Sequence, residues 1–165
     1  LLNLAFNNDN NCVLIATADG CSAVHEAMRR HPQDSNVHHQ GCLALGNLAS
    51  NNNNQVLIAS EGGITVVVAA MRQHPQDINV QYSGCGAFAS LACNDNHRVS
   101  IATAGGISAV LGAMRQHPQD INVQHYGCQA LATLAFNNDN SVSIATTGGI
   151  SAVLGAMRQH PQDIN

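Results

Sequence analysis

The motif His-Pro-Gln-Asp occurs four times in this chain, and each copy begins 43 residues after the one before it, at residues 31, 74, 117 and 160. A glycine keeps the same step, at Gly20, Gly63, Gly106 and Gly149. A Gly-Cys pair does so too, at 41–42, 84–85 and 127–128. A fixed period of this length is typical of stacked repeats, in which each unit buries its apolar face only against its neighbours. The period therefore predicts an elongated array of units.

The repeat divides the chain into one domain, residues 1–165, with complete units at 8–50, 51–93 and 94–136 and partial units at 1–7 and 137–165. We expect either a piece of a longer array or an array whose end faces are covered by another chain, because the partial units carry no polar capping repeat. Neighbouring repeats or end-to-end association are therefore possible partners. In the last unit we expect an apolar set to be left partly uncovered: Ile150, Val153, Leu154 and Met157.

Residues 51–93 show how one unit is expected to fold into three helices. A short helix over 54–60 follows an Asn turn, and Gly62-Gly63 breaks it, because glycine accepts the backbone angles of a sharp turn. The second helix, 64–73, has one apolar stripe with helical spacing. Pro75 cannot continue that helix. Asp77 stands where the third helix, 78–92, needs an N-cap.

The third helix of each unit carries an apolar stripe that should pack inward. In residues 51–93 the stripe is Val80, Gly84, Ala87, Phe88 and Leu91, and we expect Gly84 to allow the close approach of a neighbouring helix. No stretch alternates with period two for long enough to indicate a sheet. The sequence therefore predicts an all-α fold.

The composition excludes several classes of partner. Only 10% of residues are charged, lysine is absent and the net charge is −4, so there is no basic stripe to neutralise a phosphate backbone. We expect no nucleic-acid partner. No apolar run approaches the roughly 20 residues that span a bilayer, so we expect no membrane insertion.

The six cysteines do not predict disulfides. Cys42, Cys85 and Cys128 occupy the same position in successive units. Stacked helices lie about 8–10 Å apart, whereas a disulfide needs Cα atoms within about 7 Å. We interpret these three as small core residues and expect an intracellular, reducing location, cytoplasmic with the nucleus left open. Cys12, Cys21 and Cys93 show no metal-like spacing.

Two strings in the repeat resemble the armadillo family over the whole chain. Residues 51–64 supply Asn-Asn-Asn-Asn-Gln-Val-Leu-Ile-Ala-Ser-Glu-Gly-Gly-Ile, and residues 37–49 end in Ala-Leu-Gly-Asn-Leu-Ala. HEAT repeats, with two helices per unit, are the nearest rival, and the Gly-Gly break favours armadillo. The resemblance implies a right-handed superhelical α-solenoid whose third helices line a concave groove that binds extended peptides.

In the armadillo family an Asn near the end of each third helix holds the peptide backbone. The resemblance places that position at Asn3, Asn47, Ser90 and Thr133, so two units keep the Asn. The Trp position of the nuclear-import members falls on Leu43, Gly86 and Gln129, and the chain has no Trp. A nuclear-import role is therefore not expected.

A second stripe of the third helix, opposite the apolar one, is the candidate binding surface. It varies between units, whereas residues 101–122 and 144–165 differ only at Ala104 and Thr147. Its side chains share one helical face and are uncharged, with Tyr82 and Tyr126 as the expected anchors. Together with Asn3, the predicted groove comprises Asn36, His39, Gln40, Leu43, Asn47, Asn79, Tyr82, Ser83, Gly86, Ser90, Asn122, His125, Tyr126, Gln129 and Thr133. The alternative interpretation of this stripe is a solvated face.

No residue pattern indicates catalysis, a cofactor or a metal. Each copy of the motif supplies one His–Asp pair, and successive pairs lie one unit apart, so they do not converge on a tetrahedral site. The repeated cysteines are expected to be buried. We expect the arginines of the rim to be satisfied by helix ends and by Asp34, Asp77 and Asp120; they are Arg29, Arg72, Arg115 and Arg158.

Three functional hypotheses follow. The first is a non-enzymatic scaffold that binds a peptide or partner protein in the groove. The second is an architectural segment that packs through its end faces and leaves the groove empty. The third, a regulatory array attached to an enzyme, would differ only in the flanking sequence.

Overall fold

The computed structural model of this protein describes residues 8–161, and every regular element in that range is an α-helix. Each complete unit contributes a short, a middle and a long helix. The short helices are α2 (Asp9–Thr17), α5 (Asn52–Ser60), α8 (Asp95–Thr103) and α11 (Asn138–Thr146). The middle helices are α3 (Gly20–Arg30), α6 (Gly63–Gln73), α9 (Gly106–Gln116) and α12 (Gly149–Gln159). The long helices are α4 (Ser35–Leu48), α7 (Ile78–Leu91) and α10 (Ile121–Leu134).

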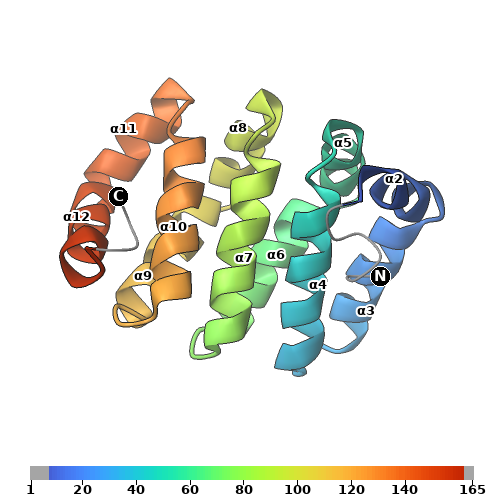
Figure 1. The fold of residues 1–165 in the computed structure, drawn as a ribbon, viewed down its shortest axis with the longest axis horizontal. Coiled ribbons are helices and arrows are strands. Elements are labelled where there is room, and N and C mark those ends of the chain that lie inside the picture. Colours follow the sequence, from blue (N-terminus) through green and yellow to red (C-terminus); the bar gives the residue numbers. More distant parts are fainter. Residues whose placement is uncertain (1–7, 162–165) are drawn as a thin grey trace.

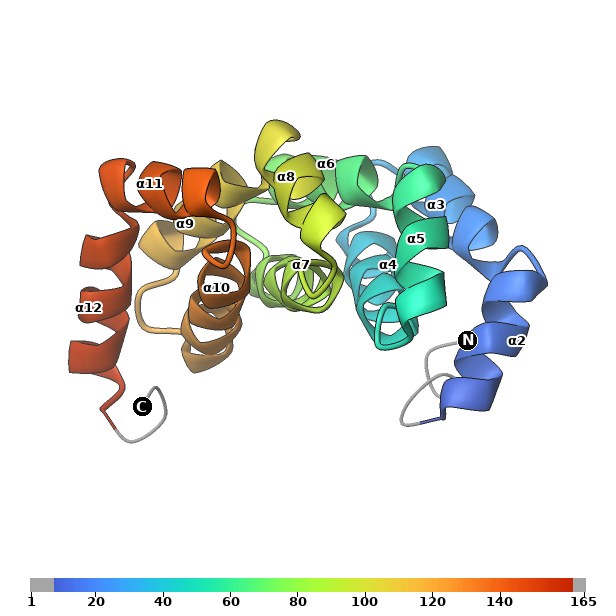
Figure 2. The same ribbon diagram turned by 90° about the horizontal axis from the view of Figure 1, so that it is seen from above.

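The units follow one another in chain order, with α4, α7 and α10 side by side across the molecule (Figure 1). Seen from above, the helices form an arch with these three long helices toward its inner side and α2 and α12 at its two ends (Figure 2). The prediction of an all-helical fold is confirmed for the described residues.

Side-chain caps explain where the short and the long helices begin. The Asp77 carboxylate accepts hydrogen bonds from the backbone N–H groups of Asn79 and Val80, at 2.9 and 3.2 Å, which confirms the predicted N-cap. Asn51 caps α5 in the same way, so this helix begins at Asn52 rather than at the predicted residue 54. Each cap satisfies backbone donors that the first turn of a helix leaves unpaired.

The two glycines of the break have different tasks. Gly62 has a φ of 84°, in the left-handed region where a Cβ is unfavourable. At Gly63 a Cβ would lie 2.4 Å from Cγ2 of Ile58. Because glycine has none, α6 can start directly against the end of α5. In the first unit Asp19 takes the left-handed position, with a φ of 56°.

The predicted inward stripe of α7 is buried throughout: Val80, Gly84, Ala87, Phe88 and Leu91. A Cβ on Gly84 would lie 2.6 Å from Cγ of Met71, so the neighbouring helix that needs this space is α6, through its methionine. In α4 the corresponding Val37 is only half-buried.

Cys42 and Cys85 lie in the core, as expected, and are completely buried, whereas Cys128 is only half-buried. In the described part of the chain no disulfide joins two cysteines. Burial raises the pKa of the Cys42 thiol to about 12.

Within residues 8–161 no single helix is long and apolar enough to cross a membrane, although α5 and α6 together, bent by 71°, pass the same length and composition test.

Candidate binding groove

The residues predicted to line a groove belong to the three long helices on the inner side of the arch (Figure 2). Asn3 lies outside the described residues. The exposed members are Asn36, Gln40, Asn79, Asn122, His125, Tyr126 and Gln129. The half-buried members are His39, Leu43, Asn47, Tyr82, Gly86, Ser90 and Thr133. Ser83 alone among the described members is buried.

Four of these side chains form a continuous row of rings, here named the aromatic row: His39, Tyr82, Tyr126 and His125. The Tyr82 and Tyr126 rings stack with their centroids 6.2 Å apart and their planes at 26°. His39 meets Tyr82 edge-on at 5.5 Å, and His125 meets Tyr126 edge-on at 5.3 Å. The row thus crosses three successive units, α4, α7 and α10.

A backbone contact fixes one end of the aromatic row. Nδ1 of His39 lies 3.0 Å from the carbonyl oxygen of Asn79. Because a carbonyl only accepts hydrogen bonds, Nδ1 must carry the proton and donate. The imidazole of α4 therefore ties its unit to the first turn of α7.

A small cavity of about 110 Å³ opens beside the aromatic row between α4 and α7, here named the inter-unit pocket. No charged side chain lines it. Its walls are Cys42, Leu43, Gly46, Asn47, Tyr82, Ser83, Gly86, Ala87, Ser90 and Tyr126.

Two hydroxyls of the stripe, those of Ser83 and Thr133, are engaged by their own helices. Oγ of Ser83, a residue that is 2% exposed, donates to the carbonyl oxygen of Asn79 at 2.7 Å. Oγ1 of Thr133 donates to the carbonyl of Gln129 at 2.9 Å. Hydroxyls at helical positions often bond backward in this way. Ser83 therefore forms part of the pocket base instead of the open stripe that the sequence predicted.

The amides of the stripe, by contrast, are available. Within residues 8–161 no hydrogen bond is made by the side-chain amides of Asn36, Gln40, Asn47, Asn79, Asn122 or Gln129. Each amide offers two donors and an acceptor. The groove thus presents neutral hydrogen-bonding groups on both sides of the aromatic row.

Two groups at this surface have shifted pKa values. The Ser35 hydroxyl and the N–H groups that Asp77 caps hold the pKa of that carboxyl below its usual range. Burial raises the pKa of Tyr82, helped by the charges of Tyr126 and Asp120. The Tyr82 phenol therefore stays protonated at neutral pH and can donate a hydrogen bond.

The repeated His-Pro-Gln-Asp motif links neighbouring units, which the sequence analysis did not predict. Nε2 of His117 lies 2.8 Å from the carbonyl oxygen of Pro75, and Nε2 of His74 lies 3.1 Å from that of Pro32. His160 repeats the contact with Pro118 at 3.2 Å. A signal was present in the sequence, because the whole motif repeats every 43 residues and so places each of these His residues 42 residues after the Pro that it contacts. In the described part of the chain no three His, Cys, Asp or Glu residues are grouped so as to hold a metal.

We expected the rim arginines to pair with Asp34, Asp77 and Asp120, and this prediction is wrong: no ion pair in the described residues joins them. Those carboxylates cap helices instead, and Arg29 pairs with Glu26 at 2.8 Å. Arg115 does bond to a helix end, as expected: its Nη2 donates to the carbonyl oxygen of Thr147, which follows α11, at 2.6 Å.

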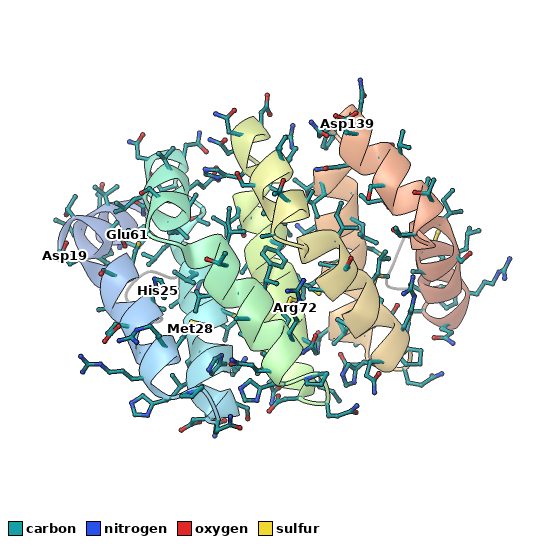
Figure 3. All side chains as sticks on the ribbon, turned by 180° about the vertical axis from the view of Figure 1, so that it is seen from behind. Asp19, His25, Met28, Glu61, Arg72 and Asp139 are labelled. Carbon is teal, nitrogen blue, oxygen red and sulfur yellow. The ribbon has the colours of Figure 1, made fainter. Side chains whose placement is uncertain are left out.

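On the outer side of the arch, His25, like Arg115, contacts a carbonyl oxygen at the end of a short helix in the next unit. It points from α3 toward Glu61 at the end of α5 (Figure 3), and its Nδ1 lies 2.7 Å from the Glu61 carbonyl oxygen. Side chains of one unit thus hold the helix ends of the next.

Comparisons with protein-family models, with curated proteins and with solved structures find no match for this chain. The groove offers amides together with the phenols and imidazoles of the aromatic row, which spans three units.

Proposed function

We propose that this chain is an armadillo-type, right-handed α-solenoid that acts as a non-enzymatic scaffold and binds a peptide or partner protein along the groove of α4, α7 and α10. The observation that carries the proposal is the stacking of Tyr82 on Tyr126 across a unit boundary. Tyrosines contribute disproportionately to protein interfaces, because they add rigid apolar area and a hydrogen bond at little entropic cost.

The free amides support an extended ligand. An extended peptide presents backbone N–H and C=O groups at regular spacing, and each needs a partner when it leaves water. The side-chain amides of Asn47 on α4 and Gln129 on α10 each offer donors and an acceptor. They can bind a ligand without breaking a hydrogen bond within the protein. The groove carries no charged side chain near the pocket, so the ligand segment is expected to be uncharged there.

The test is selection of ligands from a displayed library of random linear peptides. Enriched peptides are synthesised and titrated calorimetrically into the wild-type chain and into a Tyr82→Ala/Tyr126→Ala variant. Losing two tyrosine anchors should weaken binding by about 30-fold or more. The matched control, Val56→Ala/Val99→Ala, changes two exposed residues of the short helices and should bind like the wild type. Equal affinity for the tyrosine variant would place the binding surface elsewhere.

A second candidate, an architectural segment that packs through its end face, is supported by α12. Ile150 and Leu154 are 60% and 45% exposed, whereas the equivalent Ile107 and Leu111 are 5% and 1% exposed inside the array. Sedimentation velocity separates the two candidates. Self-association of the wild type that Leu154→Asp abolishes supports packing through this face, and a monomer at high concentration counts against it.

A further inference from the structure

The inter-unit pocket is shaped by two glycines. Gly46 from α4 and Gly86 from α7 both line it, and the Tyr126 ring covers Gly86, with Cδ1 3.5 Å from where a Cβ would stand. At the next unit boundary the equivalent positions carry the larger Ala89 and Gln129. The pair of glycines beneath the stacked tyrosines is therefore present at the boundary between α4 and α7 and absent at the boundary between α7 and α10.

The volume of the pocket sets the size of what can enter. A water molecule in the liquid occupies about 30 Å³, and an apolar cavity of about 150 Å³ holds a benzene ring. The inter-unit pocket, at about 110 Å³, is larger than one water and smaller than the cavity that holds benzene. It fits a group of about four carbon atoms by the same comparison.

The walls set the chemistry of the occupant. Leu43, Ala87 and the two tyrosine rings supply apolar surface, and no charged side chain is present to pair with an ionic group. Burying an unpaired charge here would be very unfavourable, whereas burying an aliphatic group is favourable. At the same pocket Asn47 has an uncommitted amide that can bond the main chain next to the inserted group.

We propose that the inter-unit pocket is a specificity site, which takes one Val, Leu or Pro side chain from an uncharged stretch of the groove ligand. The inference rests on the function proposed above and adds what the ligand must contain. Tyr82 and Tyr126 cover the inserted side chain, Gly46 and Gly86 leave room for it, and Asn47 holds its backbone.

The first experiment uses N-acetyl-leucine methylamide as the probe, titrated into the ¹⁵N-labelled chain and followed by amide chemical shifts. Saturable shifts at Asn47, Gly86 and Ala87 are expected. N-acetyl-glutamate methylamide, of similar length but charged, should bind at least tenfold more weakly. Equal binding of the two probes, or shifts that map to other residues, would overturn the proposal.

The second experiment fills the pocket. Gly86→Leu should abolish the shifts caused by the leucine probe and weaken the library-selected peptides at least tenfold. Gly112→Leu is the matched control, because Gly112 also lies within a helix and has no atom within 4 Å of a built Cβ. Gly86→Ala, whose Cβ makes only an ordinary contact with Tyr126, gives a smaller loss and remains informative should the leucine variant fail to fold.

The failure of this inference can be told from failure of the proposed function. Peptides that need Tyr82 and Tyr126 but bind Gly86→Leu as tightly as the wild type would overturn the pocket and leave the groove intact. Selected peptides that share no Val, Leu or Pro at a fixed position would do the same. The proposal is supported if the selected peptides share an aliphatic residue at one position and lose their affinity for the Gly86→Leu variant.

Discussion

Nε2 of Gln81 lies 2.9 Å from the carbonyl oxygen of Met71, and this bond closes the end of α6 from within the core. Gln124 closes α9 in the same way, with its Nε2 2.8 Å from the Met114 carbonyl. The equivalent residue of the preceding unit is His38, which is 2% exposed. Its ring lies near the backbone of Met28 and His31, yet among the described residues neither ring nitrogen makes a well-aligned hydrogen bond.

Replacing His38 by Gln is expected to stabilise the protein. The amide can repeat the bonds of Gln81 to the last carbonyls of α3, and a buried hydrogen bond contributes about 1 kcal/mol. The free energy of unfolding, measured with urea at pH 7.5, should rise by about that amount. The reciprocal change, Gln81→His, should lower it. A gain from both changes, or from neither, would contradict this account of the helix end.

The protein is expected to lose stability in mild acid. Burial lowers the pKa of His38, helped by the charge of His74, and burial also lowers the pKa of His97. The unfolded chain then binds protons at higher pH than the folded one, so the free energy of unfolding is maximal above the unfolded value of about 6.5 and falls as the pH drops below it.

A double variant, His38→Gln/His97→Asn, should flatten that pH profile. Asn is chosen because Asn54 and Asn140 occupy the position of His97 and donate from Nδ2 to the carbonyls of Leu48 and Leu134. Urea unfolding between pH 7.5 and 5 measures the slope. His31→Gln, at an exposed imidazole, is the control and should leave the slope unchanged. An unaltered slope in the double variant would assign the acid response to other groups.

Asp19→Gly is expected to stabilise the first unit. Asp19 has a φ of 56°, and the equivalent Gly62, Gly105 and Gly148 have φ values of 84° to 94°. A residue with a Cβ is strained by about 1 kcal/mol in this region, and Asp by somewhat less. Thermal unfolding should shift upward in Asp19→Gly and downward in Gly105→Ala. Opposite shifts would mean that the greater freedom of glycine in the unfolded chain dominates.

Met114 and Met157 occupy the same place in successive units but have different surroundings. Met114 is 2% exposed and Met157 is 39% exposed. Met114→Ala leaves a cavity and should cost about 2–5 kcal/mol, whereas Met157→Ala should cost about 1 kcal/mol or less. Chemical denaturation of the two variants makes the comparison. Similar losses would indicate that α12 is covered in solution.

Thiol labelling should separate the cysteines by burial. Cys93 is exposed, whereas Cys42 and Cys85 are completely buried and burial raises the pKa of both thiols. Only the thiolate reacts, so Ellman's reagent should modify Cys93 first and the buried pair only after unfolding. Mass spectrometry of digests assigns the sites. Rapid labelling of Cys85 in the native protein would contradict the packing of α7.

Local features of the structure followed from local sequence. Asp77 and Asn51 cap helices because a short acceptor side chain can reach the next backbone N–H groups, and Gly62 turns the chain because it lacks a Cβ. These interactions span only a few residues, so the helix bounds were predicted to within about two residues, as expected for capped helices. The 43-residue period likewise predicted that the units would be alike.

What the tertiary structure alone decided is how the units meet. The sequence placed Tyr82 and Tyr126 on one stripe but gave no distance between them, and it wrongly paired the rim arginines with the capping aspartates. It also missed the contact of each motif His with the Pro of the preceding unit. These contacts join residues about one repeat apart in the chain, and they depend on the tilt and spacing of stacked helices, which the packing of whole units determines.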